Sequence, residues 1–173
     1  MTEQNSSESD WSELHKAACK GDVGALRYLL DSGIDVNTRV LTTGDTALHI
    51  AAYHGNEACI DMLLDRGAEV GVVNSQNDTP LHLAALAAQP TALVALLKHG
   101  ADADITNLRQ QRAIDYLPNV IACSLSSYDA VSQARRILER ASSSDIASNT
   151  SRRFTSDIIN SHENRSKKEN TRQ

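Results

Sequence analysis

Short apolar segments with helical spacing follow one another in pairs along the first two thirds of the chain. One pair begins at Asp45 with DTALHIAAYHGNEACIDMLLDRGAEV, and another begins at Asp78 with DTPLHLAALAAQPTALVALLKHGADA. In each pair an alanine-rich segment is followed by a leucine-rich one after a short break. The pattern therefore predicts a series of helix-turn-helix units.

These units recur in one frame, 33 residues apart between Asp45 and Asp78. An offset of 34 residues in the other direction brings SELHKAACKGDVGALRYLLDSGIDVN, from Ser12, into the same frame. Further along, RAIDYL from Arg112 keeps the apolar positions but has Asp115 where the other copies have histidine. Self-similarity at this period is the signature of a repeat protein.

Residues that begin and end helices stand at the expected places in the frame. Thr46 and Thr79 suit the N-cap position, and Pro80 suits the first helical turn, where no backbone N–H is needed. Glycine, which adopts the left-handed conformation that often ends a helix, follows most of the segments. These glycines are Gly21 and Gly55 after the inner helices, and Gly33, Gly67 and Gly100 after the outer ones.

With these residues in register, the chain resembles the ankyrin-repeat family from about Trp11 to Leu117. The TPLH-type helix starts, the alanine pairs, the Leu-Leu pairs and the Gly-Ala-Asp endings carry the resemblance. It implies an all-α solenoid of stacked helix-turn-helix units with β-turn or hairpin fingers between them. We expect about four repeats within a domain spanning 11–141, namely 11–43, 44–76, 77–109 and a degenerate cap at 110–141.

Three departures from the repeat are visible. Ala88 stands where the other repeats have glycine, so a strained or reshaped turn is predicted there. The first finger is one residue longer than the second, and we expect its Val40 and Leu41 to be exposed.

The fourth repeat is interrupted, since Pro118 ends RAIDYL early. A second helix is predicted at about Asp129–Arg140. Its apolar residues fall on one face, and its charged residues fall mostly on the other, as a solvent-facing end cap requires. The apolar residues are Val131, Ala134, Ile137 and Leu138, and the charged ones are Arg135, Arg136, Glu139 and Arg140.

Both ends of the chain have compositions typical of disorder. Residues 1–10 are polar and acidic, and residues 142–173 are rich in serine and asparagine. This C-terminal tail carries 6 Lys/Arg against 4 Asp/Glu of the chain's 17 and 22, so it is basic while the rest is acidic. The stretch RRFTS resembles a site for basic-directed kinases, with Thr155 or Ser156 as acceptor.

Composition and charge exclude several classes of function. A net charge of −5 argues against nucleic acid as a direct partner. Cys19, Cys59 and Cys123 are too far apart for a CxxC site, so neither a disulfide framework nor zinc is predicted. The start of the chain lacks the features of a signal peptide, and Leu81–Leu97 is too short to cross a membrane. We expect a soluble, monomeric protein of the cytoplasm, with the nucleus left open.

The histidines raise the question of catalysis or metal binding. His15, His49 and His82 recur once per repeat, so a repeat spacing of roughly 10 Å separates them, too far to share a metal. In ankyrin repeats this histidine, with the neighbouring threonine, bonds backbone between repeats, and the resemblance implies the same role here. No nucleophile with a base, carboxylate pair or phosphate loop is found in the sequence, so we expect no enzyme, cofactor or metal site.

The resemblance also implies where another protein binds. In this family partners contact a concave face built from the finger tips and from the two residues after each inner-helix alanine pair. By register, the expected contact residues are Trp11, Lys20, Thr42, Thr43, Asp45, Tyr53, His54, Gln76, Asp78, Leu86, Leu108 and Arg109, with Cys19, Ser75, Ala87 and Gln111 beside them. Two alternatives stay open, because Trp11 also suits a cap on the first repeat and Leu86 also suits local packing.

The sequence thus predicts a non-enzymatic protein–protein interaction module that acts as an adaptor, inhibitor or escort. The alternative is a regulatory subunit whose tail is the switch, controlled by phosphorylation of RRFTS, with the repeats as an anchor.

Overall fold

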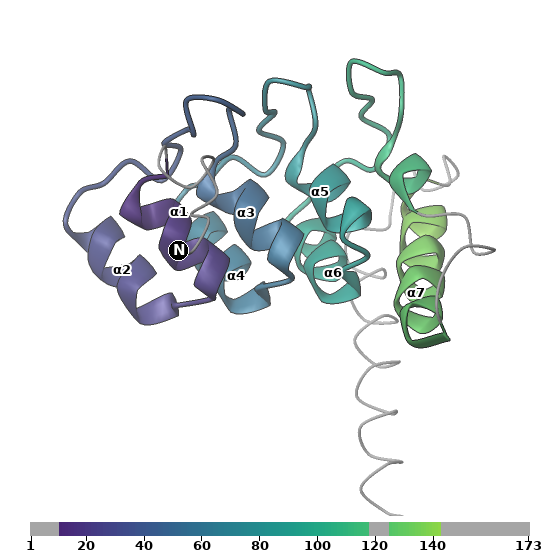
Figure 1. The fold of residues 1–173 in the computed structure, drawn as a ribbon, viewed down its shortest axis with the longest axis horizontal. Helices are drawn as coiled ribbons and strands as arrows, with labels where there is room; N and C mark the ends of the chain where they lie inside the picture. Colours follow the sequence, from purple (N-terminus) through teal and green to yellow (C-terminus); the bar gives the residue numbers. More distant parts are fainter. Residues whose placement is uncertain (1–10, 118–124, 143–173) are drawn as a thin grey trace, which may run out of the picture. The chain divides into compact units, whose positions relative to one another are not determined.

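In a computed structural model, which describes residues 11–117 and 125–142, helix pairs follow one another in a stack (Figure 1). Side chains are described for all of these residues except 125–128. Three helix pairs precede a 3₁₀ helix and a longer final helix. The elements are α1 (Glu13–Lys20), α2 (Val23–Asp31), α3 (Ala47–His54), α4 (Glu57–Asp65), α5 (Pro80–Leu86), α6 (Pro90–Lys98), η1 (Ala113–Tyr116) and α7 (Leu125–Ala141).

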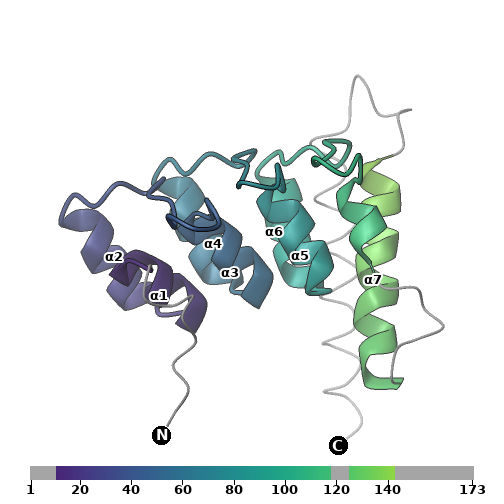
Figure 2. The ribbon, with the colours of Figure 1, turned by 45° about the horizontal axis from the view of Figure 1, so that its top comes forward.

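The inner helices pack on one another, α1 on α3 and α3 on α5, and the outer helices follow as α2, α4 and α6 (Figure 2). Three fingers project from the same side of the stack, between α2 and α3, between α4 and α5, and between α6 and η1 (Figure 1). The predicted solenoid of stacked helix-turn-helix units with projecting fingers is confirmed. Within residues 11–117 and 125–142, the fingers hold an isolated Arg39–Thr46 bridge and no strand.

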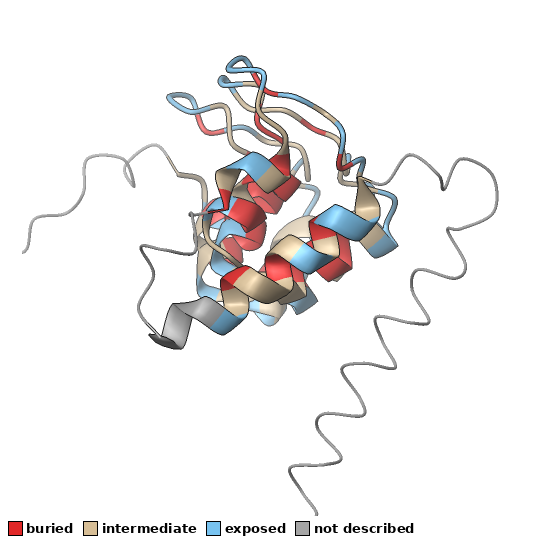
Figure 3. Cartoon of the chain, turned by 90° about the vertical axis from the view of Figure 1, so that its right-hand side faces the viewer, coloured by how far each residue is buried: buried red, intermediate tan, exposed pale blue. Residues whose placement is uncertain are grey.

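Small residues allow the inner helices to approach closely. The alanine pairs Ala17-Ala18, Ala51-Ala52 and Ala84-Ala85 are all buried. Figure 3 shows buried residues, in red, along the packed helices of the stack. On the outer helices, Leu63 and Leu96 are fully buried, whereas Leu64 and Leu97 are only partly buried against the core. The first leucine of each of these two pairs therefore contributes more burial than the second.

The predicted helix ends are confirmed. Gly21 and Gly55 have φ values of 71° and 72°, and Ala88 adopts the same region with φ 50°. A β-carbon on Gly55 would lie 2.6 Å from Oε1 of Gln89, the end of a flexible side chain that can move, so this position needs glycine for its conformation. At Ala88 the strained alanine predicted from the sequence is present.

The first finger corrects one expectation. Leu41 is 90% exposed as predicted, but Val40 is only 1% exposed and belongs to the core. The Val40 amide donates to the Asp45 carbonyl at 2.8 Å, and its carbonyl accepts from the Gly44 amide at 2.8 Å. These bonds across the finger hold Val40 with its side chain buried, and the extra residue is accommodated at the tip.

The last repeat is degenerate, as predicted. A single 3₁₀ turn, η1, replaces its inner helix, and α7 packs on α6 as the outer helix. Val131, Ala134 and Leu138 are buried, and Arg136, Glu139 and Arg140 are exposed. The predicted start at Asp129 was wrong, because the helix begins at Leu125, and no glycine or proline separates the two positions.

The segments predicted to be disordered, residues 1–10 and nearly all of 142–173, lie outside the described residues. Among the helices that are described, none is both long enough and apolar enough to cross a membrane.

Candidate protein-binding surface

The three frame histidines join each repeat to the next. In His49, Nδ1 accepts from the Thr46 amide at 3.2 Å, and Nε2 lies 3.0 Å from the Asp78 carbonyl in the following finger. Since Nδ1 is an acceptor, the proton is on Nε2, which donates to that carbonyl. His15 reaches the Thr38 carbonyl at 3.0 Å and His82 reaches the Gln111 carbonyl at 3.1 Å in the same manner.

Each of these histidines also completes a capping box, because its ring takes the place usually held by glutamate. Burial lowers the pKa of His15 and of His49 below the ordinary value, although carbonyl contacts oppose the shift. Both groups are therefore neutral, which suits a structural bond. The structural role implied by the family resemblance is confirmed.

No cluster of three histidine, cysteine or acidic side chains that could hold a metal occurs among the described residues. Cys59 is a buried thiol whose pKa is raised by burial, with a smaller effect from the Asp22 carboxylate. Cys123 lies outside the part of the chain that the structure describes.

An exposed surface follows the C-terminal ends of the inner helices. We call it the inner face, and it comprises Cys19, Lys20, Tyr53, His54, Leu86 and Ala87. Tyr53 and Leu86 occupy equivalent positions on α3 and α5 and are 44% and 47% exposed, although the alanines before them are fully buried. The helices are thus held by the core while these two side chains reach solvent.

His54 connects two repeats across the inner face. Its ring meets the Tyr53 ring edge-on, with centroids 5.3 Å apart. Its Nε2 lies 3.3 Å from the Cys19 sulfur on α1. Lys20, the next residue along, is exposed and gives this end of the inner face a positive charge.

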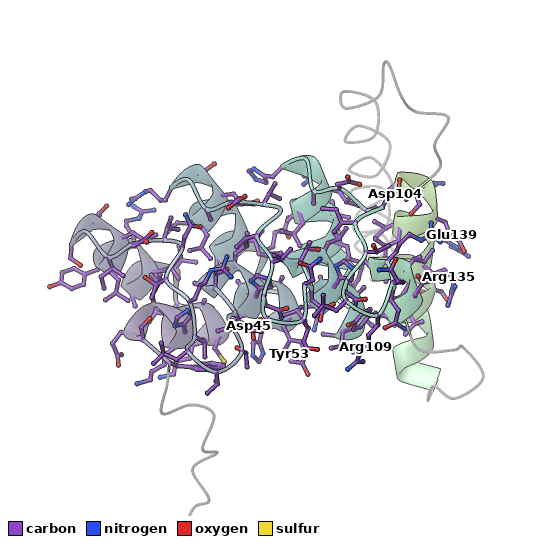
Figure 4. All side chains as sticks on the ribbon, turned by 90° about the horizontal axis from the view of Figure 1, so that it is seen from above. Asp45, Tyr53, Asp104, Arg109, Arg135 and Glu139 are labelled. Atoms are coloured by element: carbon purple, nitrogen blue, oxygen red, sulfur yellow. The ribbon has the colours of Figure 1, made fainter. Side chains whose placement is uncertain are left out.

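The finger tips supply a second set of exposed residues. Thr42, Thr43, Gln76 and Arg109 are exposed, and Leu108 is 67% exposed. Viewed from above, Tyr53 and Arg109 lie along one long side of the stack, and Asp104 lies on the other (Figure 4). The structure thus brings finger residues and inner-face residues to the same side.

Two predicted contact residues are instead used inside the stack. Asp78 is only 6% exposed, and its Oδ1 accepts from the side-chain Nδ2 of Asn107 and from the Tyr116 hydroxyl, both at 2.8 Å. Asp45 is half-buried, and its Oδ1 accepts from the side-chain Nδ2 of Asn74 at 2.8 Å. Exposure was wrongly expected for Asp78, because its side chain bonds to the next repeat.

Trp11 is partly buried and packs against the core. This placement agrees with the cap on the first repeat that the sequence left open.

Two features were missed in the sequence. Tyr28, on the outer helix α2, is 74% exposed, more than Tyr53.

Tyr116 is the second feature. Its ring packs edge-on against the His82 ring, with centroids 5.7 Å apart, and its hydroxyl donates to Asp78, so it ties η1 to the third repeat. Burial and the neighbouring Asp78 carboxylate raise the pKa of the Tyr116 phenol. The signal available in the sequence was the residue type at this position of the repeat. Tyr116 stands where the two preceding repeats have the apolar residues Leu83 and Ile50.

Thr155 and Ser156, the predicted phosphorylation sites, lie outside the described residues.

Comparison with known proteins gives one consistent family. The family model for ankyrin repeats, three copies long, matches residues 14–107. A transient receptor potential cation channel subfamily A member 1 homolog of Caenorhabditis elegans is 40% identical over 68 residues, which is 39% of this chain and 6% of that protein. Human SH3 and multiple ankyrin repeat domains protein 2 is 39% identical over 71 residues, 40% of this chain and 4% of that protein.

The chain therefore spans only a small part of the length of these relatives. Among solved structures, the crystal structure of the human ASB11 ankyrin repeat domain is similar, with a TM-score of 0.63 and 27% sequence identity. That similarity covers 75% of this chain and 54% of that one.

Proposed function

Because the chain belongs to the ankyrin-repeat family, we propose that it binds a partner protein through the inner face and the finger tips, as an adaptor, inhibitor or escort. Ankyrin repeats are protein–protein interaction modules, and human SH3 and multiple ankyrin repeat domains protein 2 is among the relatives that share this segment. The partner's identity is set by the exposed side chains rather than by the fold.

One observation carries the proposal, namely the exposure of Tyr53 and Leu86 at equivalent positions on two packed helices. Large apolar side chains on a rigid backbone lose little entropy on binding and exclude water effectively. The exposed Leu108 and Arg109 on the same stack extend the surface. Tyrosine and arginine are among the residue types enriched in interface hot spots.

The test is affinity purification with the full-length chain, followed by measurement of the affinity for the captured protein. Tyr53→Ala is expected to weaken that affinity by about tenfold or more. Tyr28→Ala is the matched control, since Tyr28 is an exposed tyrosine on an outer helix. Equal unfolding midpoints would show that both variants are folded.

Equal losses in both variants, or no loss in either, would contradict the assignment of the inner face. The proposal also includes a monomeric chain in the cytoplasm or nucleus, which sedimentation of the purified protein and cell fractionation would test.

A further inference from the structure

The second and third fingers have the same internal geometry. In the second, the Asn74 carboxamide oxygen accepts from the amides of Gln76 and Asp78 at 2.9 and 3.0 Å. In the third, Asn107 accepts from the amides of Arg109 and Gln111 at the same two distances. Asn77 and Gln110 then turn with φ values of 61° and 59°. The two fingers therefore present their backbone groups in the same way.

Each finger is bonded to the next by its backbone. The Thr43 carbonyl accepts from the Ser75 amide at 3.0 Å, and the Gln76 carbonyl accepts from the Leu108 amide at 3.1 Å. Side chains reinforce both contacts, since Asn74 donates to Asp45 and Asn107 donates to Asp78. The fingers thus form a ladder, in which the Thr43 and Gln76 carbonyls each accept from an amide of the following finger.

The third finger is the last one in the described part of the chain, and its equivalent carbonyl has no backbone donor there. The Arg109 carbonyl is equivalent to those of Thr43 and Gln76, yet among the described residues no amide donates to it. The neighbouring Leu108 is 67% exposed, and the Arg109 side chain is also exposed. Gln111 replaces the aspartate of the earlier fingers, and its neutral amide can both donate and accept.

We propose that an extended segment of a partner protein adds to this end of the ladder as a further rung. A backbone N–H of the segment donates to the Arg109 carbonyl, an apolar side chain packs on Leu108, and a carboxylate pairs with the Arg109 guanidinium. Main-chain bonds give such an addition its affinity, and the two side-chain contacts give it selectivity. The inference rests on the proposed protein-binding function and specifies which part of the partner is recognised.

A second copy of the chain suits this end poorly. To continue the stack, it would bring α1 and α2 against η1 and α7. On α1, Glu13 and Lys16 form an ion pair at 2.9 Å. The equivalent positions on α3, which packs against the preceding repeat, are the buried Ala47 and Ile50. The exposed residues of α7 include Arg136, Glu139 and Arg140. Stacking of a second copy would bury these charges. A peptide that contacts only the third finger would leave them in solvent.

The test uses the full-length chain to select binders from a library of short random peptides. Synthetic versions of the enriched peptides are titrated against wild type, Leu108→Ala, Arg109→Glu and the control Leu41→Ala, which alters an exposed leucine on the first finger. We expect the two third-finger variants to bind the peptides about tenfold more weakly than wild type does. The control is expected to bind them with the affinity of wild type. N-methylation of one peptide amide should abolish binding, while methylation of its neighbour should not.

The outcomes separate this inference from the proposed function. Peptides whose binding depends on Tyr53 and not on Leu108 or Arg109 would overturn the inference and leave the inner face as the binding surface. Failure to enrich any peptide sensitive to Arg109→Glu would also overturn it, as would insensitivity to N-methylation. Concentration-dependent self-association lost in Leu108→Ala would show that the occupant is a second copy, and competition by a synthetic peptide of residues 143–173 would show that it is a segment of this chain.

Discussion

His15, His49 and His82 join adjacent repeats only while their rings are neutral, because Nδ1 must accept from a backbone amide. A proton on Nδ1 would face that N–H and break the capping box. The folded chain therefore resists protonation of His15 and His49, whose pKa values burial lowers.

Acid should destabilise the protein for this reason. The unfolded chain takes up a proton near the ordinary histidine pKa of about 6.5, whereas folded His49 takes it up only at lower pH. The stabilisation is complete above about pH 6.5 and decreases below it. Urea midpoints measured between about pH 7.5 and about pH 5.5 should fall with pH.

In His49→Gln the midpoint should be lower at neutral pH but should change less with pH than in wild type. His54→Gln is the control, since His54 is exposed and makes no bond to the next finger. An undiminished pH dependence in His49→Gln would contradict the account.

The strained alanine gives a second prediction for a single residue. Ala88→Gly should stabilise the chain by about 0.5–1 kcal/mol, because glycine adopts the left-handed region without the β-carbon clash. Gly55→Ala is the reciprocal variant and should be destabilising, since φ at this position is 72° and alanine is strained in that region. Thermal unfolding of both variants checks the pair, and a destabilised Ala88→Gly would show that the turn is not strained.

Among the elements, the outer helices derive their stability from burial against neighbours rather than from their own length. Each of α2, α4 and α6 has only 9 residues, too few for a stable isolated helix. On α4, Leu63 is one of the fully buried side chains that make this contact.

Leu63→Ala is therefore expected to lower the free energy of unfolding by about 2–5 kcal/mol. The exposed Leu41→Ala should change it by less than about 0.5 kcal/mol. Chemical denaturation measures both. Similar losses in the two variants would mean that the packing of α4 has been misassigned.

The repeat frame made the helices, their glycine ends and the histidine bonds predictable, since each depends on residues that recur in register. Val40 and Asp78 could not be placed from the sequence. Their burial depends on bonds across a finger or to the following repeat, which leave no local pattern. The face that carries Tyr53 and Leu86 was predictable by register, but its use in binding depends on a partner.

At the scale of the whole molecule, the fourth repeat is the one that departs from the helix-pair pattern of the other three. Its inner helix is reduced to η1, which Tyr116 ties to Asp78 at 2.8 Å. Stability in a repeat protein is a sum over neighbouring units, so weakening this junction should loosen the end of the stack before the rest.

Tyr116→Phe should cost about 1–2 kcal/mol, since the hydroxyl bond to a buried carboxylate is lost. Hydrogen exchange should show earlier opening of α7, with α3 amides unaffected. Tyr53→Phe, which alters an exposed tyrosine, should change neither. Uniform loss of protection along the chain would contradict a locally weakened junction.

The finger ladder and the histidine bonds also bear on how this gene could lengthen. Three bonds between neighbouring repeats have counterparts 33 residues on. Asn74–Asp45 corresponds to Asn107–Asp78, His49–Asp78 to His82–Gln111, and Ser75–Thr43 to Leu108–Gln76. A tandem duplication of residues 45–77 would therefore supply matching donors and acceptors at both of its junctions. The Tyr116–Asp78 bond has no such counterpart, so insertions by unequal recombination should be tolerated before Asp78 and selected against after it.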